Sequence, residues 1–211
     1  MAKTPDFDVL IIGGGAAGIS CALVIGSAME KAYARGRKAG IILHQKNSHL
    51  QSALLNNVFG ISPGTKGNHL LEQGVDHLGD LYPQILQIGK EKVKEVAEVD
   101  GFYKALTNRR EYTAKIIVVA VGYTSPMRIS GFDQYLIPHK KAKASKNRIQ
   151  LQNNDHLVKP GLYVAGTLAG WRSQYAIACG SGAAVATDIL TIWNEGEHTK
   201  VHDKLVQEEK Q

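Results

Sequence analysis

The sequence predicts an α/β protein with a central parallel sheet, helices on one side of it and a small antiparallel β-meander on the other. Two apolar runs, Phe7–Ile12 and Ala39–His44, flank an alanine-rich stretch from Gly15 to Ala34. Continuous apolar runs are typical of strands buried on both faces of a parallel sheet. A strand–helix–strand unit of this kind favours parallel strands joined by a right-handed crossover. Between Lys92 and Thr113, apolar and polar residues alternate around Asp100-Gly101, which predicts the meander.

The same patterns predict the remaining elements. These are helices over residues 68–80 and from about 174 to 193, and inner strands over 84–88, 115–121 and 161–165. Residues 126–152 form the least regular part of the chain. A chain of 211 residues has the size of one α/β domain. We expect that domain to span residues 1–193, with a charged C-terminal tail over 194–211.

A basic run, His139–Arg148, carries much of the formal net charge of +6. It fits a patch for nucleic acid or an acidic partner, or else a solvated loop. We favour the loop and expect no nucleic-acid partner, because no aromatic residues are interleaved for base stacking.

The cysteines, the histidines and the apolar segments bear on the compartment and on metal binding. Cys21 and Cys179 are far apart and form no CxxC motif, and the eight histidines lack ligand spacing, so we expect no metal site. We expect no membrane segment, because no apolar stretch reaches the roughly 20 residues of a span. The N-terminus lacks the features of a signal peptide, so a cytoplasmic protein is expected.

A glycine-rich turn joins the first predicted strand to the first helix, and it reads Gly13, Gly14, Gly15, Ala16, Ala17, Gly18. In such a GxGxxG turn the first glycine allows the tight turn and the second lets the backbone approach a pyrophosphate. The third lets the helix pack close to the sheet. The helix N-terminus then offers free N–H groups and a partial positive charge to the phosphates. The turn therefore predicts a dinucleotide site.

The end of the second strand departs from the usual dinucleotide site, where an acidic residue holds the adenosine ribose. Here the chain reads His44-Gln45-Lys46, without a carboxylate. His44 or Gln45 can hydrogen-bond a ribose hydroxyl. Alternatively, His44 and Lys46 favour a 2′-phosphate, which keeps open an NADP-binding protein without flavin.

Three later segments decide for flavin, because they resemble thioredoxin-reductase-like (pyridine nucleotide-disulfide oxidoreductase) flavoproteins. Residues 111–122, EYTAKIIVVAVG, are similar to the second FAD-domain signature of that family. Residues 158–167, VKPGLYVAGT, resemble its late strand, and residues 173–182, SQYAIACGSG, resemble the start of its last helix. The resemblance implies a Rossmann-like FAD-binding domain and an oxidoreductase.

The resemblance also implies where FAD is held. Its contacts run from the isoalloxazine ring to the adenine, and each is placed at a strand end, a loop or the start of the last helix. They are Asn57 near the isoalloxazine, Gln174 and Tyr175 through backbone N–H groups at the pyrimidine edge, Gly166 and Thr167 at the ribitol, Ala120 and Gly122 at the pyrophosphate, and the Val93 backbone at the adenine.

The chain also departs from the family. Residues 123–159 are too few for the second, NADPH-binding domain with its redox CxxC, so dithiol chemistry is not expected. Thr167 replaces the aspartate that holds the ribitol, and Asn47-Ser48-His49 replaces a Gly-Gly-Gln. No catalytic side chain stands out. The electron donor is therefore expected to be external, either NAD(P)H binding transiently or a partner reductase.

The departures from the family also allow a function other than catalysis. A non-catalytic flavin-binding or redox-sensing module that acts through a protein partner is the main alternative to an enzyme. A flavin face left exposed without the second domain would be a natural docking surface for a protein redox partner or for a second copy of the chain in a homodimer. Cys179 lies near a helix start, where a thiol can become reactive, but we favour a packed thiol.

Overall fold

The computed structural model describes residues 4–46 and 48–202, and it confirms the α/β, Rossmann-like fold class. The main sheet has the strand order β11-β12-β8-β1-β2-β5. Its strands are β1 (Phe7–Ile12), β2 (Ala39–Leu43), β5 (Ile85–Gly89), β8 (Glu111–Val119), β11 (Leu157–Lys159) and β12 (Leu162–Val164). All neighbours in this order are parallel except β11 and β12. The carboxyl ends of the parallel strands therefore share one edge of the sheet.

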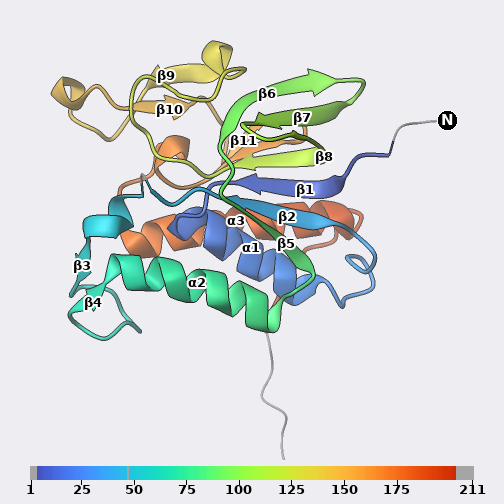
Figure 1. Ribbon diagram of the computed structural model, residues 1–211, viewed down its shortest axis with the longest axis horizontal. Coiled ribbons are helices and arrows are strands. Elements are labelled where there is room, and N and C mark those ends of the chain that lie inside the picture. Colours follow the sequence, from blue (N-terminus) through green and yellow to red (C-terminus); the bar gives the residue numbers. More distant parts are fainter. Residues whose placement is uncertain (1–3, 47, 203–211) are drawn as a thin grey trace, which may run out of the picture.

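Three helices cover one face of this sheet (Figure 1): α1 (Ala16–Ala28), α2 (Gly67–Leu81) and α3 (Tyr175–Trp193). Val9 and Ile11 of β1 are fully buried in the core on this side. The first helix was expected to reach Ala34, and this was wrong. It ends at Ala28, because the N–H of Met29 bonds back to the carbonyl of Gly26, and the chain continues in turns to Arg37.

The meander lies over the opposite face of the sheet (Figure 1) and consists of β6 (Val93–Val99), β7 (Phe102–Thr107) and the first part of β8. Leu10 and Ile12 of β1 point into this second core, together with Val96 of β6. β8 is one strand that serves both layers. Its beginning pairs with β7, and the part from Ala114 on pairs with β1. The predicted meander is present.

The region expected to be irregular contains regular elements. A small two-stranded sheet pairs β9 (Leu136–Pro138) with β10 (Ile149–Leu151), and we call residues 136–151 the basic hairpin. The 3-10 helices η2 (Asp133–Tyr135) and η3 (Ala144–Lys146) accompany it. Another short pair, β3 (Leu54–Leu55) and β4 (Thr65–Lys66), follows the 3-10 helix η1 (His49–Ser52), and η4 (Gly166–Ala169) precedes α3.

α3 differs from our expectation that no stretch reaches the length of a membrane span. By length and composition alone it is long and apolar enough to cross a membrane, with 19 residues and a mean hydropathy of 1.4. Val185, Ile189 and Trp193 are nevertheless buried in the core that α1 and β1 also line. The packing of α3 as a core helix explains its apolar composition. Of the charged tail, the last part, 203–211, lies outside the described residues.

Candidate functional site

The glycine turn between β1 and α1 is packed too tightly for side chains at two positions. Gly13 has φ +122°, and a Cβ atom there would lie 2.4 Å from the carbonyl oxygen of Ala120 at the end of β8. A Cβ atom on Gly18 would lie 1.8 Å from the carbonyl oxygen of Gly13. The turn, the first helical turns and Ala120 therefore form one close-packed unit, as the sequence pattern requires.

Gly15 is different, because it faces open space. The nearest atom to a Cβ built on Gly15 is Oγ of Ser48, at 3.8 Å. Gly15 is also the N-cap of α1, with no side-chain cap and no acidic residue in the first turn. The first N–H groups of a helix have no intrahelical partners, and together with the helix dipole they attract an anion. The geometry suits a phosphate that approaches the backbone at Gly15.

The second turn of α3 and the segment that begins at Gly166 lie against the same glycine turn. A Cβ atom on Gly166 (φ +74°) would lie 3.0 Å from Cβ of Ala17. One on Gly182 of α3 would lie 1.9 Å from the carbonyl oxygen of Ala17. The two glycines allow this close approach of backbones. Ala17 thus joins two predicted parts of the site, the glycine turn and the segment expected to hold the ribitol.

The N-terminus of α3 is the second helix start of the site. Gln174 is its N-cap, without a side-chain cap, and its own N–H already donates to the carbonyl of Arg172 at 2.9 Å. Tyr175 is the first helical residue, so its N–H has no partner within the helix. Of the two backbone donors expected at the flavin, the one on Tyr175 is the better placed to meet a ligand.

A buried pair that sequence reasoning missed supports Gly166. The backbone N–H of Gly166 donates to Oγ of Ser181 at 2.7 Å, and Oγ lies 2.7 Å from Nε2 of His156. Ser181 and His156 are both buried. The Ser181 hydroxyl accepts from Gly166 and shares a second hydrogen bond with Nε2 of His156, whose direction depends on the tautomer of the ring. The two residues have no recognisable sequence spacing, so no motif indicated them.

Gln45 has a structural role that the ribose hypothesis did not include. Its side-chain Nε2 donates to the carbonyl of Gly14 at 2.9 Å and to the carbonyl of Leu71 in α2 at 3.1 Å. Both amide protons are thereby used, and only the amide oxygen is left for a ligand. Gly14 packs against the same side chain, since a Cβ atom there would lie 2.9 Å from Cγ of Gln45. Gln45 therefore ties the glycine turn to α2.

His44 follows β2 at the position of the missing carboxylate. Burial and the positive charges of Lys92 and Lys46 lower the pKa of His44 below its ordinary value. The imidazole is therefore neutral near pH 7, and it can both donate a hydrogen bond and accept one. Lys92 is near because β2 pairs with β5, with Leu43 opposite Gly89, so the two strands end side by side.

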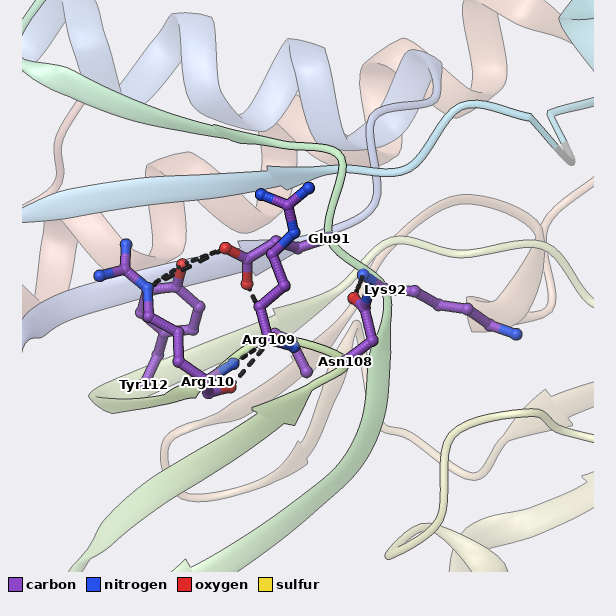
Figure 2. Close-up of polar contacts among 7 residues, drawn as sticks. Glu91, Lys92, Asn108, Arg109, Arg110 and Tyr112 are labelled. Atoms are coloured by element: carbon purple, nitrogen blue, oxygen red, sulfur yellow. Dashed lines mark hydrogen bonds and ion pairs between the residues drawn. The ribbon is translucent and has the colours of Figure 1, made fainter.

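A buried carboxylate, Glu91, anchors the loop between β5 and β6 at this end of the site (Figure 2). It accepts hydrogen bonds from the Thr107 hydroxyl at 2.7 Å and the Tyr112 hydroxyl at 2.9 Å, and the Arg110 guanidinium lies 4.0 Å away. The N–H of Lys92 donates to the side chain of Asn108 at 2.7 Å. These contacts fix the backbone just before Val93, the predicted adenine contact.

Other predicted residues stand apart from this cluster of contacts. Asn57 is exposed, in the loop between β3 and β4. Gly122 follows β8 with open space where a Cβ atom would lie, and the Val93 side chain is buried in the meander core. Asn47 lies outside the described residues. The proposed contacts of these residues with FAD stay predictions.

The two cysteines are free, and each has a raised thiol pKa. Burial raises the pKa of the fully buried Cys21 strongly, and burial also raises that of Cys179. A raised pKa leaves both as neutral thiols near pH 7, which are poor nucleophiles. This agrees with the packed role favoured for Cys179.

The family model described as pyridine nucleotide-disulphide oxidoreductase matches residues 7–183. This match spans every part of the site, from β1 through the first turns of α3. The chain belongs to the pyridine nucleotide-disulphide oxidoreductase family. This is the oxidoreductase family that the resemblance of the three later segments predicted. A search of curated proteins found no match.

Solved structures show the same fold as this member of the family. A thioredoxin reductase from Gloeobacter violaceus superposes with a TM-score of 0.69 at 15% identity, covering 97% of this chain and 100% of that one. A ferredoxin-flavin thioredoxin reductase from Clostridium acetobutylicum gives a TM-score of 0.63 at 18% identity, covering 90% and 98%. Thioredoxin reductase from T. acidophilum gives a TM-score of 0.63 at 15% identity, covering 90% of this chain and 99% of that one. At these identities the likeness establishes the fold.

Proposed function

We propose that this protein is a single-domain FAD-binding oxidoreductase of the cytoplasm, whose domain spans residues 1–193 and whose electron donor is external. The observation that carries the proposal is the contact of Ala17 with both Gly166 and Gly182. It brings the open glycine turn, the Gly166 segment and the second turn of α3 together at the carboxyl ends of the parallel strands. Ligands of open α/β sheets bind at that edge.

The residues of this edge fit FAD. The backbone at Gly15 and the start of α1 would hold the pyrophosphate, because a Cβ atom on Gly15 would meet nothing within ordinary contact except Ser48. Gly166 and Thr167 would hold the ribitol, and the N–H of Tyr175 would meet the pyrimidine edge. Bound FAD would supply the electron-transfer chemistry, while the protein supplies orientation and electrostatics. The positive end of the α3 dipole favours negative charge at that place.

The proposal of an external donor rests on the cysteines. Cys21 in α1 is fully buried, and Cys179 lies in α3, so the described residues offer no dithiol that could exchange with a substrate disulfide. A transiently bound NAD(P)H or a partner reductase would therefore deliver the electrons. Solved structures with this fold include a reductase named for ferredoxin. This supports a protein, rather than NAD(P)H, as the electron donor.

Mass spectrometry of the ligand released by heat, from protein purified without added cofactor, tests the binding. FAD in roughly one copy per chain is expected, and its loss in Gly15→Ala would place it at the glycine turn. Anaerobic stopped-flow absorbance at the flavin maximum then tests catalysis. Fast bleaching by NADH or NADPH would support a self-sufficient reductase. Bleaching only by a reduced protein partner would support the external reductase, and no bleaching by any donor would leave a non-catalytic flavin-binding module.

A second candidate, an NADP(H)-binding protein without flavin, is favoured by the charges around His44. The positive charges of Lys46 and Lys92 both lower the pKa of His44. Glu91, the residue before Lys92, is buried, and its carboxylate already accepts hydrogen bonds from Thr107 and Tyr112. Such a setting suits a 2′-phosphate better than a ribose diol. This candidate predicts a colourless preparation that binds NADP⁺ at least about tenfold more tightly than NAD⁺. A yellow protein that releases FAD would exclude it.

A further inference from the structure

The basic hairpin is a folded element whose charge the proposed function leaves unused. It carries Lys140, Lys141, Lys143, Lys146 and Arg148, and it contains no aspartate or glutamate. β9 and β10 pair along their length, and Arg148 shares a backbone hydrogen bond with His139 at 2.9 Å. The four lysines are exposed. The run His139–Arg148 is thus the exposed connection between β9 and β10, as expected, and its charged side chains have one sign.

Several of these charges are held in place by aromatic rings. The ammonium groups of Lys140 and Lys141 lie 6.0 and 5.6 Å from the ring centre of Trp171. The Arg148 guanidinium lies 5.0 Å from the ring centre of Tyr123, and its Nη1 donates to Oγ1 of Thr124 at 3.0 Å. Cation–π contacts of this kind restrain otherwise mobile side chains. The hairpin therefore presents an ordered pattern of positive charge.

The hairpin is also joined to the candidate flavin site. The His139 ring contacts the carbonyl of Thr167 through Nε2 at 3.0 Å. Gln150 accepts from the N–H of Lys140 at 2.7 Å, and a Cβ atom on Gly170 would lie 2.7 Å from its side-chain oxygen. The segment from Thr167 to Trp171 thus lies between the hairpin and the start of α3. A partner bound to the hairpin would be next to the proposed flavin.

We propose that the basic hairpin and Trp171 form the docking surface for an acidic electron-carrier protein. The inference rests on the proposed function, since it assigns the partner of the same site. Complementary charge steers such encounters and raises their association rate. Trp171, which is 38% exposed, supplies an aromatic centre of the kind enriched at protein interfaces. The carrier is the reductant: two one-electron transfers, with two protons taken from water, reduce FAD to FADH₂ and release two oxidised carriers.

Nucleic acid is the less suitable partner, because the aromatic rings are already occupied. The Trp171 ring stacks on His156, with centroids 5.9 Å apart and an interplanar angle of 22°. Tyr123 contacts the rings of His49 and His139, at 5.5 and 5.1 Å. Single-stranded nucleic acids need free ring faces for base stacking. Charge alone would then give only weak, non-specific binding.

The test measures binding of a small acidic [2Fe–2S] ferredoxin, used as a model carrier, to the full chain by titration calorimetry at low ionic strength. We expect Lys140→Glu/Lys141→Glu to weaken binding by at least about tenfold. Lys31→Glu/Lys38→Glu makes the same change of net charge beyond the end of α1 and just before β2, away from the carboxyl ends of the strands, and it should change binding less than about twofold. Lys143→Glu/Lys146→Glu, free of ring contacts, should act like the first pair.

The outcomes separate this inference from the proposed function. Equal weakening by the hairpin and control pairs would overturn the docking surface, because the effect would then come from net charge alone. Tighter binding of a poly-uridine RNA than of the ferredoxin, lost in the same hairpin variants, would also overturn it. If FAD is retained but no variant changes ferredoxin binding, the docking inference fails by itself. If docking behaves as expected in a chain that holds no FAD, the proposed function fails instead.

Discussion

Ser181 in α3 holds the backbone of Gly166, whose N–H donates to the serine Oγ at 2.7 Å. The same oxygen lies 2.7 Å from Nε2 of His156. A side chain from the second turn of α3 thus determines the path of the segment between β12 and α3. Because Gly166 also contacts Ala17, this buried hydrogen bond connects the proposed ribitol end of the site with its pyrophosphate end.

Replacing Ser181 with alanine should therefore weaken both the fold and cofactor binding. The substitution removes the buried partner of the Gly166 N–H and of Nε2 of His156, which costs about 1–3 kcal/mol of unfolding free energy. Urea unfolding followed by circular dichroism measures this loss, and fluorescence titration measures FAD affinity. Ser27→Ala is the matched control, because the Ser27 hydroxyl bonds only within its own helix, to Val24. Equal effects of the two variants would contradict a special role for Ser181.

Gly15 and Gly18 should respond differently to the same substitution by alanine. Gly15→Ala meets only Ser48 Oγ at 3.8 Å and keeps an allowed backbone, so the unfolding free energy should fall only by the cost of alanine at an N-cap, about 1 kcal/mol. The added methyl group occupies the space proposed for the pyrophosphate, so FAD affinity should fall by at least about tenfold.

Gly18→Ala should instead destabilise the protein, because its Cβ would lie 1.8 Å from the Gly13 carbonyl and β1 and α1 would have to separate. Thermal unfolding of both variants, with and without FAD, distinguishes the two effects. A Gly15→Ala variant that retains full FAD affinity would contradict pyrophosphate binding at the glycine turn.

Local patterns predicted the parts of the structure that depend on neighbours in sequence. The apolar runs predicted β1 and β2, and the GxGxxG spacing predicted the positions where no Cβ fits, Gly13 and Gly18. The end of α1 was missed, because the alanine-rich composition continues past Ala28 while the backbone changes to turns. Composition alone does not report that change.

The missed parts of the site depend on contacts between distant residues. Ser181 and His156 are 25 positions apart, and Glu91 and Tyr112 are 21 apart. Neither pair has a motif, so only the fold brings them together. Gln45 illustrates the converse. Its place after β2 indicated a ribose contact, but its amide protons are used by Gly14 and Leu71, which no sequence pattern shows.

Removal of the Glu91 carboxylate should loosen the loop that precedes Val93. Glu91→Ala removes the acceptor of the Thr107 and Tyr112 hydroxyls, and a buried network that loses its acceptor is destabilised by about 1–3 kcal/mol. Glu91→Gln retains one acceptor oxygen, so its unfolding free energy should fall less than that of Glu91→Ala. Urea unfolding ranks the variants. Glu95→Ala, an exposed change on β6, is the control. If Glu91→Ala proves no worse than the control, the carboxylate does not anchor the loop.

The pH response of His44 should report what binds beside it. Burial and the charges of Lys92 and Lys46 lower its pKa in the folded protein. The unfolded chain therefore binds more protons as the pH falls below about 6.5, the ordinary pKa of histidine, and the stability contributed by a neutral His44 is lost in that acidic window. Lys92→Gln should raise the pKa of His44 toward its ordinary value and reduce this loss.

NMR titration of the His44 ring measures the shift in the free and ligand-bound protein. Bound NADP⁺ should raise the pKa of His44, because a 2′-phosphate dianion favours the charged ring, whereas FAD, with a ribose diol at that place, adds no such charge. His198, outside the proposed site, serves as the internal reference. A rise on adding NADP⁺ but not on adding FAD would favour the NADP(H) candidate. If the pKa of His44 does not change on adding NADP⁺ and the protein binds FAD, the flavoprotein is favoured.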